Sequence, residues 1–189
     1  MWQFETDPEF QSKLDWMTDF VSEEIEPLDY LFPKDETYNV NNEALMHIMA
    51  PLKKRVREAG LWACHLPPEM GGGGWGQLKL ALMNEILGRS FFAPTIFGTA
   101  APDTGNAEIL AHFGTEQQKA TYLQPLMDGD IVSCFSMTEP QAGADPKMFE
   151  CAARKVGNEW ILSGEKWFAS NARWSEFLIV RVVTDPAVS

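Results

Sequence analysis

The spacing of apolar residues changes near residue 130, and this change constrains the fold more than any other feature. Before it, apolar side chains recur every three or four residues, as in Phe10, Leu14, Met17, Val21 and Ile25. That period places them on one face of a helix. After it, short apolar stretches alternate with polar residues as strands do. We therefore expect an α+β chain, with an all-helical N-terminal domain over residues 1–130 and a β domain over residues 131–189.

Proline, glycine and capping residues set the ends of the expected helices. Pro51 lies inside the second helix and either bends it or starts a new one. Asp103 is expected to cap one helix, and Thr115 to open the next in a capping box with Gln118. The helical patterns cover residues 8–26, 42–59, 77–88, 103–114 and 115–129.

The β part contains four apolar or alternating stretches, at residues 131–137, 149–154, 160–162 and 177–183. Gly157-Asn158, between Val156 and Trp160, is typical of a tight hairpin turn. We expect this part to be mainly a sheet with at least one hairpin.

Charge and composition exclude several classes of partner. The chain has 27 acidic and 15 basic residues, a net charge of −12, which disfavours nucleic acid and anionic membranes. No stretch approaches the roughly 18 apolar residues of a membrane span, and residues 1–10 do not resemble a targeting peptide. Cys64, Cys134 and Cys151 are expected to be buried free thiols, which fits a reducing, cytoplasmic location.

Two further sequence features could suggest a phosphate or metal site, but each has a simpler explanation. The Gly71–Gly74 run lacks the Lys-Ser/Thr pair of a phosphate-binding P-loop, so we expect a turn. His47, His65 and His112 lie far apart without cysteine or carboxylate partners at ligand spacing. We therefore expect no metal site.

Two segments of the β part are more specific. Residues 135–145 read FSMTEPQAGAD and residues 164–171 read GEKWFASN. They resemble the acyl-CoA dehydrogenase family, whose members carry a T-E-P-x-A-G-S-D loop and, further on, a G-x-K-x-[WF]-I-[TS]-N segment. Residues 60–69 and 113–126 also resemble family stretches, so the resemblance covers nearly the whole chain in order.

The resemblance implies a helical N-terminal domain, a middle antiparallel β-barrel-like domain and a C-terminal helical domain. This chain corresponds to the first and to the beginning of the second. In the family the catalytic base is a glutamate of the C-terminal part. We therefore expect a fragment without catalytic residues of its own and without activity in isolation.

The resemblance also implies an FAD site. Phe135 and Met137 are expected to pack against the flavin, and Thr138 to bond its edge near N5. Phe168 is expected to form an aromatic wall beside the ring, whereas Trp167 could instead pack as core. Residues assigned to FAD are Phe135, Met137, Thr138, Ala144, Phe168, Ala169 and Ser170.

This sequence departs from the family loop at two positions. Gln141 stands where glycine is common, and Ala144 stands where a serine often bonds FAD or substrate. The backbone of Ala144 can still donate a hydrogen bond to either ligand, but its side chain cannot. Glu139 and Asp145 are expected to fix the loop rather than to act as the base.

The activity that the resemblance implies is FAD-dependent oxidation of an acyl-CoA at Cα–Cβ to the 2-enoyl-CoA, in fatty acid metabolism. Electrons would pass to an electron-transfer flavoprotein-type acceptor, and the enzyme would be a homo-oligomer, dimer or tetramer. Two alternatives stay open. One is an acyl-CoA oxidase or flavin monooxygenase of the same superfamily, and the other is a non-catalytic half that binds acyl-CoA or a partner.

Overall fold

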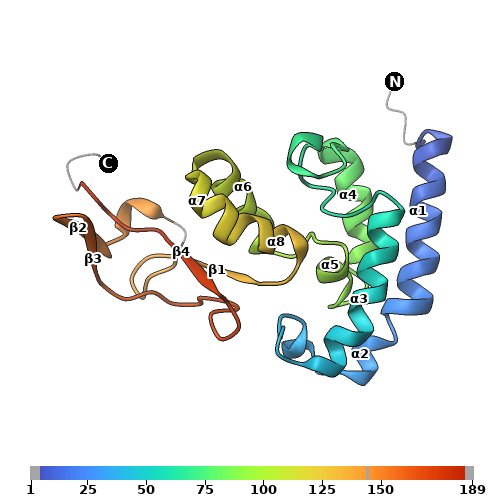
Figure 1. The fold of residues 1–189 in the computed structure, drawn as a ribbon, viewed down its shortest axis with the longest axis horizontal. Helices are drawn as coiled ribbons and strands as arrows, with labels where there is room; N and C mark the ends of the chain where they lie inside the picture. Colours follow the sequence, from blue (N-terminus) through green and yellow to red (C-terminus); the bar gives the residue numbers. More distant parts are fainter. Residues whose placement is uncertain (1–4, 144, 186–189) are drawn as a thin grey trace.

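The computed structural model describes residues 5–143 and 145–185. Helices fill one side of the molecule and strands the other, with α6 to α8 between them (Figure 1). The helices are α1 (Pro8–Phe20), α2 (Leu28–Leu31), α3 (Glu43–Glu58), α4 (Gly76–Leu87), α5 (Ala93–Ile96), α6 (Asp103–Phe113), α7 (Glu116–Gln118) and α8 (Gln124–Asp128). The strands are β1 (Ser133–Ser136), β2 (Ala152–Val156), β3 (Glu159–Ser163) and β4 (Phe177–Val180).

Most of the expected helix ends are confirmed. The Asp7 carboxylate accepts from the Phe10 N–H at 2.9 Å and caps α1. The capping box of Thr115 and Gln118 is present. Pro51 lies inside α3 and does not split it. We attribute this to the other residues of α3, four of which are fully or nearly fully buried against the helical core.

Two wide π-helical segments of five residues each extend the α-helices of the described chain. Residues Val21–Ile25 continue α1, and Lys119–Leu123 join α7 to α8. The expected first helix therefore reaches Ile25 in a wider form, and Pro27 becomes the residue just before α2. The core packs α1, α3, α4 and α5 together, and all three cysteines are free and buried, as expected.

Asp103 does not cap α6, contrary to the sequence prediction. Pro102 takes the cap position, and Asp103 is the first residue of the helix. Its carboxylate instead accepts from the backbone N–H of Ser133 at 2.7 Å and from the Ser133 hydroxyl at 2.6 Å. The Asn106 amide donates to the same hydroxyl at 2.8 Å. This buried network fastens α6 to β1.

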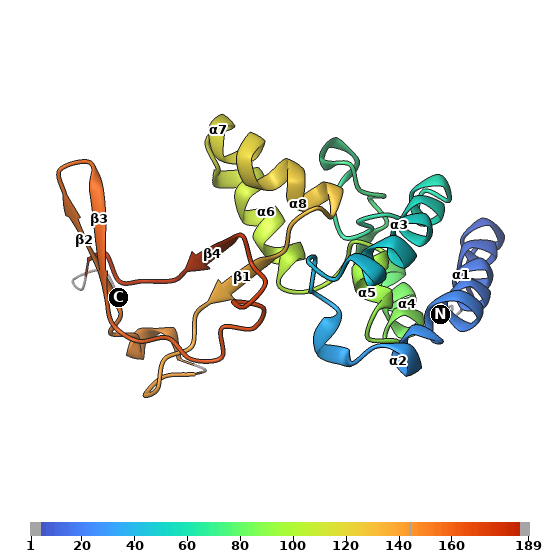
Figure 2. The same ribbon diagram turned by 60° about the horizontal axis from the view of Figure 1, so that its bottom comes forward.

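The strands form two pairs. β2 and β3 are an antiparallel hairpin around Gly157-Asn158, as expected. β1 and β4 pair in parallel, with Ser133 opposite Phe177, which differs from the all-antiparallel expectation. The long connection through residues 164–176 returns the chain to the start of β1, so that β4 runs in the same direction. The hairpin stands away from the β1–β4 pair (Figure 2).

The four-glycine run is a turn, as predicted. The N–H of Gly72 donates to the Pro67 carbonyl at 3.1 Å, and that of Gly74 to the Leu66 carbonyl at 3.1 Å. These N–H groups are therefore not free to bind an anion. None of the helices in the described ranges is long and apolar enough to cross a membrane.

Candidate functional site

The two motif segments meet in space, although about 30 residues separate them. The backbone N–H of Trp167 donates to the Thr138 carbonyl at 2.8 Å. One residue earlier on each segment, the Lys166 ammonium donates to the Met137 carbonyl, also at 2.8 Å. We call residues 135–139 and 166–170 together the loop pair.

A buried carboxylate holds the loop pair from inside. Glu139 Oε1 accepts from Lys166 Nζ at 2.7 Å, and the two side chains are 1% and 9% exposed. Glu139 also accepts from the backbone N–H groups of Glu150 at 2.7 Å and Cys151 at 3.1 Å, and from the Gln141 amide at 2.7 Å. Four donors from four different residues therefore bond this carboxylate.

These bonds keep Glu139 ionised. Burial raises the pKa of Glu139, but the hydrogen bonds from Lys166, from two backbone N–H groups and from Gln141 outweigh burial and lower it to about 2. A carboxylate so bonded is a poor proton acceptor at neutral pH. Asp145 is likewise used locally, since it accepts from the Lys147 N–H at 3.0 Å. Both contacts agree with the loop-fixing roles expected from the sequence.

The two aromatic residues of the second segment of the loop pair, Trp167 and Phe168, face outward. Phe168 is 79% exposed and adopts a left-handed backbone with φ of 54°. Trp167 is 47% exposed and meets the Phe168 ring edge-on, with 5.9 Å between centroids. Trp167 is therefore not a core residue. An exposed aromatic pair on a rigidly bonded backbone is suited to a planar ligand.

The other predicted site residues lie on the same segments. Phe135, Met137 and Thr138 are half-buried, Ala169 is half-buried and Ser170 is exposed. Ala144 lies outside the described residues. The hydroxyls of Thr138 and Ser170 make no hydrogen bond within residues 5–143 and 145–185. They remain available to the polar edge of a flavin, so the side chains present fit that group.

Comparison with known proteins decides the family. Residues 7–130 match the acyl-CoA dehydrogenase N-terminal domain, and residues 134–188 match the middle domain. This chain belongs to the acyl-CoA dehydrogenase family. The family supports an oxidoreductase with a flavin cofactor, and the α+β fold predicted from the sequence is confirmed.

Several acyl-CoA dehydrogenases resemble this chain. A probable acyl-CoA dehydrogenase of Mycobacterium tuberculosis, FadE2, is 42% identical over 143 residues, which is 74% of this chain and 34% of that protein. Acyl-CoA dehydrogenase family member 11 of Gallus gallus is 42% identical over 126 residues, or 66% of this chain and 16% of that protein.

Solved structures share the fold. A putative acyl-CoA dehydrogenase from Mycobacterium abscessus superposes with a TM-score of 0.81 at 33% identity, over 97% of this chain and 48% of that one. A glutaryl-CoA dehydrogenase from Mycobacterium smegmatis, in complex with FADH2, shares the fold with a TM-score of 0.64 at 22% identity. This chain thus spans about half the length of these solved proteins and a smaller share of the length of its curated relatives.

Sequence reasoning missed the residue that links the two segments of the loop pair. Lys166 stands at the lysine of the family motif, yet nothing in the pattern shows that its ammonium reaches Glu139 and Met137. The departure at Gln141 also gains a reason, because its amide is one of the donors to Glu139. A glycine at that position would lack this donor.

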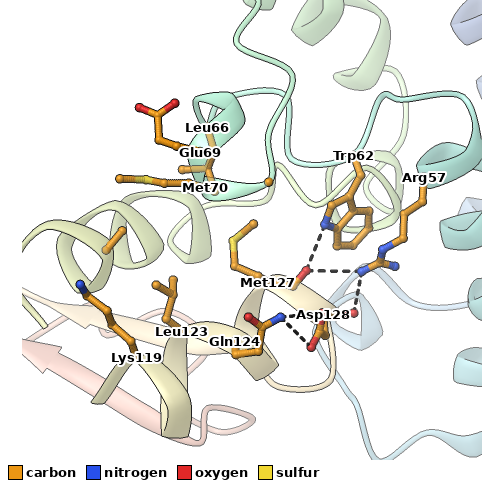
Figure 3. Close-up of a pocket in the computed structure, with 12 residues that line it drawn as sticks. Arg57, Trp62, Leu66, Glu69, Met70, Lys119, Leu123, Gln124, Met127 and Asp128 are labelled. Atoms are coloured by element: carbon orange, nitrogen blue, oxygen red, sulfur yellow. Dashed lines mark hydrogen bonds between the residues drawn. The ribbon is translucent and has the colours of Figure 1, made fainter. Parts of the chain in front are cut away.

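A separate cavity lies away from the loop pair, among the helices and the glycine-rich turn (Figure 3). It measures about 600 Å³ and separates the glycine-rich turn from α6 and α8. On one wall the Arg57 guanidinium stacks 3.7 Å from the Trp62 ring, whose N–H donates to the Met127 carbonyl at 3.0 Å. No residue of the loop pair lines it. Among the residues that the structure describes, no three histidine, cysteine or acidic side chains cluster as metal ligands.

Proposed function

We propose that the loop pair binds the isoalloxazine ring of FAD in an enzyme that oxidises an acyl-CoA thioester at Cα–Cβ to the 2-enoyl-CoA. The observation that carries this proposal is the bond from the Trp167 N–H to the Thr138 carbonyl. It brings together the two segments that carry the family motifs and leaves the Phe168 ring uncovered beside them.

Each side chain of the loop pair has a defined task in this proposal. Bound FAD supplies the acceptor for the hydride that leaves the β-carbon. Phe168 offers an aromatic face to the ring, and the hydroxyls of Thr138 and Ser170 bond its polar edge. The backbone of Ala144 is assigned to FAD or to the substrate, because an alanine there retains only backbone donation.

The proposal gives this chain no catalytic residue. Glu139, the carboxylate within the loop pair, is fully occupied by its donors and keeps a pKa of about 2. A base must instead be free to reach the substrate proton. In the whole protein we propose that a carboxylate outside residues 1–189 removes the α-proton. We further propose that electrons pass to an electron-transfer flavoprotein-type acceptor, and that the protein is a homo-oligomer in the cytoplasm.

The test uses the natural protein that carries this chain, purified and supplied with FAD. We expect an oxidised flavin band near about 450 nm that bleaches when an acyl-CoA is added without oxygen, with the 2-enoyl-CoA as product. Rapid recovery of the band in air would instead assign an acyl-CoA oxidase. A protein that binds no flavin at any concentration, or whose bound flavin no acyl-CoA reduces, would exclude the proposed function.

A further inference from the structure

One ion pair in the described part of the chain differs from all the others in its burial. The Lys166 and Glu139 side chains are 9% and 1% exposed, whereas in the remaining pairs each side chain is at least 30% exposed. Exposed pairs contribute little to stability. The Lys166–Glu139 pair therefore needs its own explanation.

The Lys166 ammonium is committed on three sides. It donates to Glu139 Oε1 at 2.7 Å and to the Met137 carbonyl at 2.8 Å, and it lies 4.6 Å from the centre of the Phe149 ring. Because two of these contacts are to residues on either side of Thr138, they fix the backbone there. The next residue after Lys166 then bonds Thr138 itself.

The Glu139 carboxylate extends the same hold to a third segment. It accepts from the N–H groups of Glu150 and Cys151, just before β2. The Cys151 carbonyl in turn accepts from the Val183 N–H at 2.8 Å. One carboxylate thus ties the motif loop to the base of the β2–β3 hairpin and, through it, to the segment after β4.

A net gain in the stability of the fold is a weak explanation for such a buried ion pair. Desolvation of two buried charges costs about as much as their attraction returns, and apolar residues of similar size are often equally stable. Apolar side chains, however, cannot form the directional bonds by which this pair holds the Met137 carbonyl and the N–H groups of Glu150 and Cys151. What the pair uniquely provides is a single arrangement of the loop pair.

We propose that Lys166 and Glu139 are positioning residues that hold Thr138 and Phe168 at the separation which the flavin ring requires. This inference rests on the proposed function, because the ligand that the arrangement serves is FAD. Neither residue touches the ring. Each acts through the backbone of its neighbours.

The first test measures FAD affinity in the natural protein and in four variants. Lys166→Met keeps the length of the side chain but removes both donated bonds, and we expect FAD to bind at least about tenfold more weakly. Glu139→Gln is the milder substitution, because it keeps the shape of the side chain. We expect the double variant to lose no more than Lys166→Met alone, because the two residues act as one unit. Lys166→Arg, which keeps the cation, should bind FAD more tightly than Lys166→Met.

Lys54→Met is the matched control. Lys54 pairs with Glu58 at 3.8 Å, and the two side chains are 76% and 63% exposed. It lies in α3, away from the loop pair. The FAD affinity of this variant should equal that of the natural protein.

The second test needs no flavin. In the apoprotein, hydrogen exchange should accelerate at the N–H groups of Glu150, Cys151 and Trp167 in Lys166→Met and Glu139→Gln, while exchange in α1 and α3 stays unchanged. Faster exchange throughout the Lys166→Met protein would indicate general unfolding. The inference would then be judged on the Glu139→Gln protein alone. Variants that bind FAD within about twofold of the natural protein would overturn the inference, whatever their exchange. If the natural protein binds no FAD, the proposed function fails instead, and local exchange still reports whether the pair positions these segments.

Discussion

The backbone N–H of Trp167 lies 2.8 Å from the carbonyl oxygen of Thr138 and donates a hydrogen bond to it. This bond joins two segments that the sequence separates by the whole β2–β3 hairpin. Beside Thr138 the Trp167 side chain is 47% exposed and the Phe168 side chain 79%. The candidate flavin surface therefore exists only because these two residues meet.

Phe168→Ala should weaken FAD binding with little effect on folding. Aromatic contacts of this kind contribute about 0.5–1.5 kcal/mol beyond buried area, so we expect FAD affinity to fall about tenfold. Because Phe168 is 79% exposed, the free energy of unfolding should change by less than about 0.5 kcal/mol. Flavin fluorescence titration and urea unfolding measure the two effects.

Phe113→Ala is the control for Phe168→Ala. Phe113 is 83% exposed at the end of α6, outside the loop pair. Its replacement should leave FAD affinity unchanged. Equal losses in both variants would show that Phe168 has no special role.

Acid should weaken the fold partly through Glu139. Burial raises its pKa, but its hydrogen bonds outweigh this and lower the pKa from the ordinary 4.5 to about 2. A lowered folded-state pKa gives stability that is complete above about pH 4.5 and is lost as the pH falls toward 2. Urea unfolding, measured in steps of about one pH unit between about pH 3 and 7, should show this loss of stability. Glu139→Gln should be less stable at pH 7 and lose less stability in acid, whereas parallel curves for both proteins would contradict the assignment.

Ser133→Ala should loosen the attachment of β1 to the helices. It removes the hydroxyl that donates to Asp103 and accepts from Asn106. The buried Asn106 amide and the partly buried Asp103 carboxylate each lose one hydrogen-bond partner. We expect unfolding to become easier by about 1–3 kcal/mol, measured by urea denaturation. Ser136→Ala, on the same strand and also buried, should cost less, because its hydroxyl makes no hydrogen bond to the described residues.

Gly98→Ala should destabilise the fold more than Gly60→Ala. Both glycines are left-handed, with φ of 66° and 68°, so each substitution carries a backbone strain of about 1 kcal/mol. A Cβ at Gly98 would also lie 2.7 Å from the Trp62 ring, whereas nothing lies within 4 Å at Gly60. Trp62 is held by its bond to Met127, so the clash should add at least about 1 kcal/mol. Thermal unfolding of the two variants compares them directly, and equal melting temperatures would show that Trp62 can move aside.

Local chemistry made several parts of this protein predictable. The period of three and four, the Asp7 cap and the Thr115 capping box place helices where the structure has them. Gly157-Asn158 specifies its hairpin because only a tight turn fits between two alternating runs. Each of these features depends on residues within a few positions of one another.

Asp103 shows where that reasoning stops. An aspartate before a helix is a good cap, yet this one turns to Ser133, 30 residues away. Its pKa is raised by burial, although the bonds from Ser133 and the charge of Lys53 act in the opposite direction. No pattern among neighbouring residues predicts whether Asp103 caps α6 or bonds Ser133.

The sequence by itself determined the helical and β parts, the family, and which segments carry the family motifs. Only the tertiary structure decided that β4 pairs in parallel with β1, that Trp167 bonds Thr138, and that Lys166 reaches Glu139. The physical reason is the separation along the chain of the residues that interact. Helix caps and hairpin turns are set by interactions between near neighbours, whereas a buried ion pair forms only when folding brings distant segments together and excludes water from both charges.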